Sequence, residues 1–188
     1  PGGLAQLEDP KGGLNMDIRE YYKQAGAFHG HWCPGLAIGV RAACEAGQAL
    51  GTQMADRHNH IQCLAESTAC WLDGIQFVLG STLGNGALKI DDTGKSAFSF
   101  YNPETGESLR YYMLELPRER PREELIDYIL SAPLDSIFRT GPVRRPFPPR
   151  SGKAPEILCP RCGEKFRADK ALCRDGLALC PHCGEEDR

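Results

Sequence analysis

The chain has 188 residues, 41% of them hydrophobic, and a formal net charge of −3. This length and composition predict one medium-sized globular domain, or one domain with a small additional module. No apolar run approaches the roughly 20 residues that a membrane span requires, and the first residues form no apolar signal segment, so we expect a cytoplasmic protein.

The charge is unevenly distributed. Residues 1–138 carry 11 basic and 18 acidic side chains, residues 139–158 carry five and one, and residues 159–188 carry six of each. The basic excess is therefore confined to one stretch, and the C-terminal region is neutral. This distribution disfavours nucleic-acid binding, which requires a basic surface.

The nine cysteines are an odd number, and four of them form two C-x2-C pairs. This usage favours metal binding in a reducing compartment over a framework of disulfides.

The first third of the chain predicts two helices joined by a short polar segment. Residues 1–15 are glycine-rich and without pattern, which indicates a flexible leader. Apolar spacing predicts an amphipathic helix over residues 16–25 and a slim central helix over residues 34–50. A polar loop follows, and we expect its histidines, His58 and His60, to be exposed to solvent rather than to bind metal.

The segment between these helices concentrates His29, His31 and Cys33 within five residues. If it is extended, the alternating side chains leave the same face and could offer three ligands to one ion. Pro34 suits the first position of the next helix, whose N-terminus would favour Cys33 as a thiolate. The alternative is a buried loop with hydrogen-bonded histidines and an inert cysteine.

A second cysteine with similar surroundings lies further along the chain. After a short strand over residues 61–65, a third helix is predicted over residues 69–79, capped by Ser67 and Thr68. Cys70 falls in its first turn and Asp73 on the same face, so both helix-start cysteines could converge on one site. The alternative for Cys70 is a packing role.

We assign that packing role to two other cysteines, Cys44 and Cys63, which lack such surroundings.

The remainder of the core predicts strands. The glycine-rich loop of residues 80–86 matches neither the P-loop nor the dinucleotide-binding motif. Residues 87–90 and a hairpin of residues 95–101 and 108–114 indicate an antiparallel sheet, and residues 121–130 a closing helix. Residues 16–138 are therefore predicted to form an α+β core, with helices packed on a mainly antiparallel sheet.

Residues 139–158 are rich in proline and arginine and are predicted to be a linker. In an extended proline-rich form its reach is on the order of 60 Å, so the C-terminal region need not rest on its own core.

The last 30 residues carry the most specific motif, C-x2-C-x17-C-x2-C. It predicts a tetrahedral four-thiolate zinc site with bonds of about 2.3 Å, formed by Cys159, Cys162, Cys180 and Cys183. Predicted strands between the pairs indicate a zinc ribbon or a treble clef. About 30 residues cannot bury a sufficient core, so this zinc is expected to be structural. Cys173 and His182 are not expected to be ligands.

Four motifs together carry a resemblance to a known family. They are Phe28-His29-Gly30-His31-x-Cys33-Pro34-Gly35-Leu36, Cys70-x-x-Asp73-Gly74-Ile75-Gln76, Gly80-x-Thr82-Leu83-Gly84 and Asp92-x-Gly94-Lys95-x-Ala97-Phe98. Over residues 17–135 the chain resembles the FmdE family of molybdenum/tungsten formylmethanofuran dehydrogenase subunits, some members of which carry a zinc module. It departs from the family pattern at Ser81, where many members have cysteine, and at Asn85, where they have lysine.

The resemblance implies an α+β core that tends to dimerise and a metal-associated cleft formed by His29, His31, Cys33 and Cys70. It also implies a subunit or accessory of a dehydrogenase complex. These ligand types suit zinc, nickel or iron.

Two hypotheses follow for the core site. In an enzyme, Cys33 and Cys70 would act as ligand or nucleophile, Asp73 as a base or an orienting residue, and Lys95 as an electrostatic partner of an anionic substrate. In a non-catalytic protein, the same site would hold or deliver a metal while the chain docks onto other subunits. Three protein ligands plus water would favour the enzyme, and four closed ligands the non-catalytic protein.

Overall fold

A computed structural model of the chain describes residues 17–51, 61–149, 152 and 154–185. The expected leader and the histidines His58 and His60 lie outside these residues. The chain forms two compact units, Pro1–Phe147 and Pro148–Arg188, and each is described by itself. None of the helices in the described residues has the length and hydrophobicity needed to cross a lipid bilayer.

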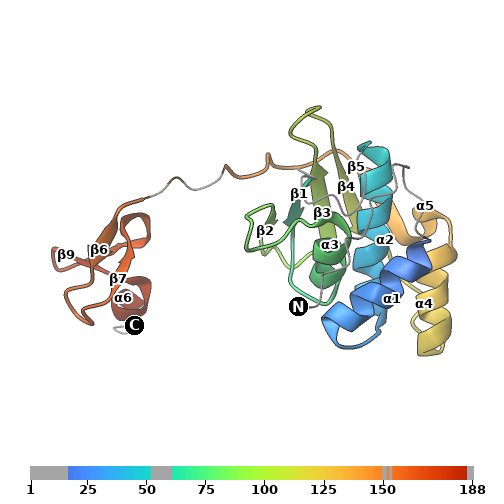
Figure 1. The fold of residues 1–188 in the computed structure, drawn as a ribbon, viewed down its shortest axis with the longest axis horizontal. Helices are drawn as coiled ribbons and strands as arrows, with labels where there is room; N and C mark the ends of the chain where they lie inside the picture. The colour runs from blue at the N-terminus through green and yellow to red at the C-terminus, as the bar shows by residue number, and fades with distance from the viewer. Residues whose placement is uncertain (1–16, 52–60, 150–151, 153, 186–188) are drawn as a thin grey trace, which may run out of the picture. The chain divides into compact units, whose positions relative to one another are not determined.

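Five helices of the first unit lie on one side of its sheet (Figure 1): α1 (Ile18–His29), α2 (Pro34–Ala49), α3 (Trp71–Leu79), α4 (Arg122–Ser131) and α5 (Leu134–Ile137). The helices expected over residues 16–25, 34–50, 69–79 and 121–130 are thus confirmed. α2 is central because it packs against α1, α3 and α4. α1 extends four residues further than expected, since it ends where Gly30 adopts φ 87° and not where the apolar pattern stops.

The sheet has the strand order β2-β1-β3-β4-β5. Its strands are β1 (Gln62–Ala65), β2 (Leu88–Ile90), β3 (Ala97–Tyr101), β4 (Ser108–Met113) and β5 (Phe138–Gly141). β1 and β2 are parallel, with α3 in the connection between them, and the other neighbours are antiparallel. The predicted α+β fold with a mainly antiparallel sheet is confirmed.

Alternation along the strands gives the sheet two different faces. Cys63, Phe98, Phe100, Tyr111 and Phe138 belong to the hydrophobic core shared with the helices. The opposite, open face carries the intervening side chains, and there Leu64, Ser99 and Arg110 align across three strands. This separation follows from the period of two in a strand.

The segment expected to be a linker from residue 139 onwards begins instead inside the sheet, where Arg139–Gly141 pair with β4. The free edge of β4 offers backbone hydrogen bonds, which composition does not reveal.

Residues 142–147, called the arm below, then cross the open face. The Tyr101 hydroxyl donates to the Arg145 carbonyl at 2.5 Å, and the Phe147 ring packs edge-on against Tyr101. The first half of the basic stretch therefore belongs to the core unit.

In its described residues the second unit is built from two hairpins and two short helical segments. β6 (Glu156–Leu158) pairs with β7 (Lys165–Arg167), and β8 (Leu172–Arg174) pairs with β9 (Leu177–Leu179). A short 3-10 helix η1 (Ala168–Lys170) and α6 (Pro181–Glu185) complete it. Asp175 and Gly176, with φ of 47° and 77°, form the turn between β8 and β9, so the strands predicted between the cysteine pairs are confirmed. This architecture is consistent with a small zinc finger.

Candidate metal centres

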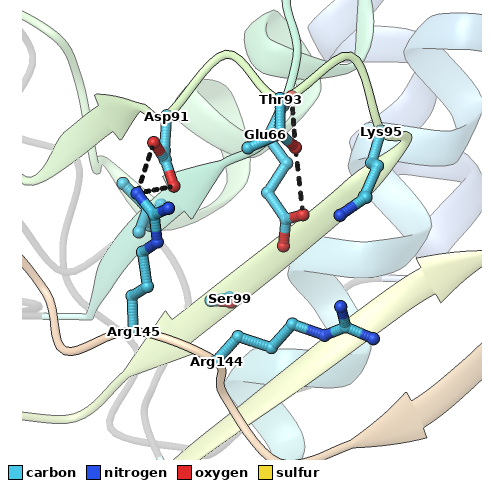
Figure 2. A pocket seen from close by; sticks show the side chains of 8 residues that line it. Glu66, Asp91, Thr93, Lys95, Ser99, Arg144 and Arg145 are labelled. Atoms are coloured by element: carbon cyan, nitrogen blue, oxygen red, sulfur yellow. Dashed lines mark hydrogen bonds and ion pairs between the residues drawn. The ribbon is translucent and has the colours of Figure 1, made fainter.

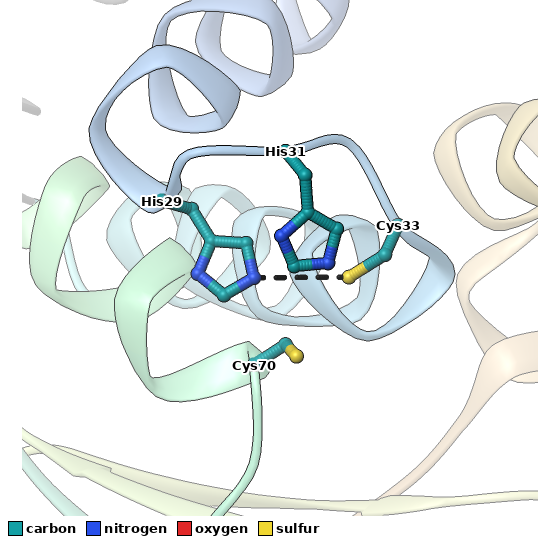
Figure 3. Close-up of side chains that lie close together, drawn as sticks. All are labelled: His29, His31, Cys33 and Cys70. Carbon is teal, nitrogen blue, oxygen red and sulfur yellow. Dashed lines mark hydrogen bonds between the residues drawn. The ribbon is translucent and has the colours of Figure 1, made fainter.

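Four side chains that lie up to 41 positions apart in the sequence meet at one point of the core unit (Figure 3). One ligand atom from each of His29, His31, Cys33 and Cys70 lies within 4.8 Å of the others, so this group, called the core cluster below, could hold a metal ion. Its members come from the end of α1, the following turn and the starts of α2 and α3.

The backbone gathers these side chains by a turn and not by the extended segment that the sequence left as one possibility. His29 is the last residue of α1, and the left-handed conformation of Gly30 then reverses the chain. Cys33 is extended, with φ −145° and ψ 160°. A turn between two helices therefore brings the His29 and His31 rings to a centroid distance of 4.4 Å.

Three hydrogen bonds hold this turn in place. The indole of Trp32 donates from Nε1 to the Lys23 carbonyl at 3.2 Å, and Arg122 of α4 donates to the Trp32 carbonyl. The Tyr22 hydroxyl donates to the Cys33 carbonyl at 3.3 Å. Trp32 also packs closely on α1, since a Cβ added at Gly26 would lie 2.0 Å from its Nε1.

Cys33 caps α2, and Pro34 takes the first helical position, as predicted. The backbone N–H of Leu36 donates to Cys33 Sγ at 3.3 Å. Cys33 is buried, and its sulfur lies at the N-terminus of α2 beside this backbone donor.

Cys70 is the N-cap of α3, where Ser67 or Thr68 was expected. Ser67 is engaged elsewhere, because its hydroxyl donates to the Lys95 carbonyl at 2.8 Å. Burial raises the pKa of the Cys70 thiol, and the neighbouring Cys33 raises it further. A cation between these two sulfurs would offset both effects.

Close packing of α2 on α3 brings the two cysteines together. A Cβ added at Gly39 of α2 would lie 2.0 Å from the Trp71 carbonyl oxygen, and one added at Gly74 of α3 would lie 2.6 Å from the Val40 nitrogen. Since no side chain fits at either position, the two backbones approach directly. The sequence predicted a slim central helix suited to close packing, which Gly39 confirms, but sequence reasoning missed the role of Gly74.

Asp73 orients one ligand of the core cluster. One carboxylate oxygen lies 2.6 Å from His29 Nδ1, and the other accepts from Gln76 Nε2 at 3.1 Å. His29 Nε2 consequently faces Cys33 Sγ, at 3.9 Å. A carboxylate behind a histidine in this way fixes the ring orientation and the tautomer that metal binding needs.

Lys95, expected beside this site, lies elsewhere in the structure. It lines a cavity on the open face of the sheet (Figure 2). The reason is its position two residues before β3, from which it reaches the face opposite the helices.

The glycine-rich loop after α3 is organised by the two residues that depart from the family pattern. The buried Ser81 hydroxyl donates to the Ile61 carbonyl. The Asn85 side chain accepts from the backbone N–H groups of Thr82 and Ala87 and donates to the Gly80 carbonyl. Both side chains therefore stabilise the loop conformation.

The second unit contains the other group that could hold a metal ion. Ligand atoms of Cys159, Cys162, Cys180 and Cys183 all lie within 4.8 Å of one another. Backbone N–H donors, led by that of Cys180, lower the pKa of Cys159 to about 6. Burial, with its neighbouring thiols, raises the pKa of Cys183. The backbone donors thus favour a thiolate at Cys159, and a cation would offset the effect of burial on Cys183.

The remaining cysteines stand outside both groups. Cys44 and Cys63 are buried in the core, and burial raises the pKa of each thiol, that of Cys44 to about 12. Cys173 is exposed on β8.

Comparison with known proteins places this site in a family. A family model described as "FmdE, Molybdenum formylmethanofuran dehydrogenase operon" matches residues 28–139, more than half of the chain and all of the core cluster. The chain belongs to the FmdE family. The fold agrees, because the chain superposes with a TM-score of 0.67 on the crystal structure of a tungsten formylmethanofuran dehydrogenase FmdE-like protein from Syntrophus aciditrophicus. That protein is 24% identical, and the match covers 95% of this chain and 97% of the other.

A further relative of this FmdE-family chain is a probable S-adenosyl-L-methionine-binding protein of Archaeoglobus fulgidus. The two are 37% identical over 93 residues, which is 48% of this chain and 25% of the relative. The matched part thus spans a quarter of that relative's length.

Proposed function

We propose that this protein is a metal-binding subunit or accessory protein of a formylmethanofuran dehydrogenase-type system. Its core cluster would hold one transition metal ion through His29, His31, Cys33 and Cys70, and its C-terminal unit one structural zinc ion. The convergence of four ligand atoms within 4.8 Å, with Asp73 behind His29, carries the metal-binding part. The link to the dehydrogenase rests on the family name.

Two imidazoles and two thiols suit zinc, and also nickel or iron. We favour zinc in the core, because four such ligands around one point match its tetrahedral preference. A zinc ion held there would act as a Lewis acid towards a substrate oxygen if one ligand position opened.

His31 is the ligand that could open that position. Its side chain is exposed and forms no hydrogen bond within the described residues, whereas a carboxylate holds His29 and a backbone N–H holds Cys33. The same exposure also favours the second candidate function, delivery of the ion to a partner, since a weakly held ligand eases release. Chemistry at this site would use Asp73 as a positioning residue and would not involve Lys95.

The test is metal content of the purified full chain. We expect two ions per chain in the wild type, one in Cys33→Ser and one in Cys159→Ser. Cys173→Ser is the matched control, because it removes an exposed thiol outside both groups, and it should retain two. A Cys33→Ser variant that retains two ions would overturn the core site.

His31→Ala separates the two candidate functions. If the ion serves chemistry, the variant should keep one core ion, and X-ray absorption should show an exchangeable water molecule bound to it in place of His31. If the ion is delivered, the wild type should already transfer it to a competing chelator within minutes, and His31→Ala faster still. Association with dehydrogenase subunits is a separate measurement, made by size-exclusion chromatography of the full chain mixed with those subunits.

We include a homodimer in this proposal, as the family resemblance implies. Light scattering of the full chain should give twice the mass of one chain, and a single-chain mass would remove the dimer from the proposal without affecting the metal site.

A further inference from the structure

A cavity of about 160 Å³ lies on the open face of the sheet, between the strands and the arm (Figure 2). Glu66 follows β1, Lys95 precedes β3, and Arg144 and Arg145 enter from the arm. Helices cover the other face, so this cavity is separate from the core cluster.

The acidic side chains of the cavity are already engaged. Glu66 Oε1 accepts from Arg110 Nε at 2.6 Å, and Glu66 Oε2 accepts from the Thr93 hydroxyl at 3.3 Å. Asp91 accepts from Arg145 Nη1 at 3.0 Å. Each carboxylate is therefore matched by an arginine.

Two positively charged side chains of the cavity wall form no ion pair with a carboxylate. Among the residues that the structure describes, neither the Lys95 ammonium nor the Arg144 guanidinium forms a hydrogen bond or an ion pair. Figure 2 shows both groups beside the cavity, with the Lys95 ammonium on the side of the Glu66 carboxylate and no hydrogen bond or ion pair drawn to either cation. When Arg110, which pairs with Glu66 beside the cavity, is counted with the wall, three arginines and Lys95 face two carboxylates, an excess of two positive charges.

A third donor nearby also lacks an acceptor. Arg110 pairs across the strands with Ser99 of the cavity wall, and its Nη2 is buried without a hydrogen-bond partner in the described part of the chain. Buried donors of this kind nearly always have a partner, so its absence indicates a missing acceptor in this region.

We propose that this cavity binds a small doubly charged oxyanion, a phosphate group. Two unmatched cations suit a dianion, and the planar guanidinium of Arg144 can donate two parallel hydrogen bonds to oxygens of one phosphate. The volume is far above the roughly 10–15 Å³ that one water needs and below the ~300 Å³ of larger ligand pockets. Binding would tie the arm to the segment before β3, since Lys95 and Arg144 would hold the same anion.

The experiment is calorimetric titration of the full chain with inorganic phosphate at pH 7.5, with chloride keeping the ionic strength constant. We expect saturable binding that Lys95→Gln and Arg144→Gln each weaken about tenfold or more, because each removes a charge-assisted hydrogen bond. Arg118→Gln is the matched control. Arg118 is exposed in the loop after β4 and forms no ion pair among the described residues, so this variant should bind like the wild type.

Three results would overturn the proposal. They are no saturable binding at tens of millimolar phosphate, binding by the two cavity variants as tight as by the wild type, and acetate binding as tightly as phosphate. Glycerol 3-phosphate distinguishes a phosphorylated metabolite from free phosphate as the ligand. Binding at least as tight as that of inorganic phosphate supports a phosphorylated metabolite, and weaker binding supports free phosphate. Metal content should stay at the wild-type value in both variants, so this result stands apart from the metal proposal.

Discussion

The Asp73 carboxylate lies 2.6 Å from Nδ1 of His29, which turns the Nε2 atom of that ring towards Cys33. Asp73→Asn should therefore weaken binding of the core ion by about 10–100-fold, because the ring loses the partner that fixes its tautomer. Competition with a chromophoric chelator measures this affinity. Asp92→Asn, which changes an exposed acid outside the cluster, is the control and should match the wild type. Equal affinities in all three proteins would show that Asp73 does not support the site.

The ligand types of the core cluster could be predicted from the sequence, but their geometry could not. H-x-H-x-C before a helix and a cysteine at the start of another helix indicate a metal site by composition and spacing alone. The turn that gathers them depends on Gly30, whose left-handed conformation a local pattern cannot distinguish from an extended chain.

Long-range contacts account for the other differences between sequence and structure. Residues 139–147 looked like a linker because proline and arginine dominate their composition, yet β5 and the arm pack on strands far away in sequence. Lys95 belongs to one of the four family motifs, as the cluster residues belong to two others, but it reaches the opposite face of the sheet. Strand pairing determines which face a residue takes, and pairing partners are not visible in one sequence.

Gly39 tests whether close helix packing builds the core cluster. Gly39→Ala places a Cβ 2.0 Å from the Trp71 carbonyl oxygen, a contact that α2 and α3 can relieve only by moving apart. We expect a loss of about 1–3 kcal/mol in the free energy of unfolding, as for other overpacked sites, together with weaker core metal binding.

Urea unfolding and chelator competition measure the two effects. Gly84→Ala is the matched control, because its added Cβ meets no atom nearer than 3.8 Å and the residue is exposed. A Gly39→Ala variant as stable as Gly84→Ala would contradict the packing argument.

The buried pair of Glu66 and Arg110 predicts a dependence of stability on pH. The Arg110 guanidinium lowers the pKa of Glu66 below its ordinary value of 4.5. A lowered pKa in the folded state means that the ionised carboxylate adds stability above the unfolded value, and that this stability is lost as the pH falls through the folded value.

Glu66→Gln should therefore lower the free energy of unfolding at pH 7 by about 1–3 kcal/mol. The difference from the wild type should shrink as the pH falls below about 4. Urea titrations across this range measure the difference. Any loss of metal at low pH affects both proteins equally and therefore does not contribute to it. Glu115→Gln, an exposed acid with no ion pair in the described residues, should show no such difference. A difference in the free energy of unfolding that does not change with pH would exclude the ion pair as its source.

The C-terminal unit should fold only with its metal ion. Apart from the cluster cysteines, its hydrophobic cluster consists of Leu179 with Phe166 packed against it, which is too little apolar surface to stabilise two hairpins. Cys159→Ser should therefore remove one metal ion and collapse the amide dispersion of residues 154–185 in NMR spectra, while the signals of residues 17–51 and 61–147 stay in place. Cys173→Ser should change neither region. Dispersed signals from residues 154–185 after complete removal of the metal would mean that these hairpins are stable on their own.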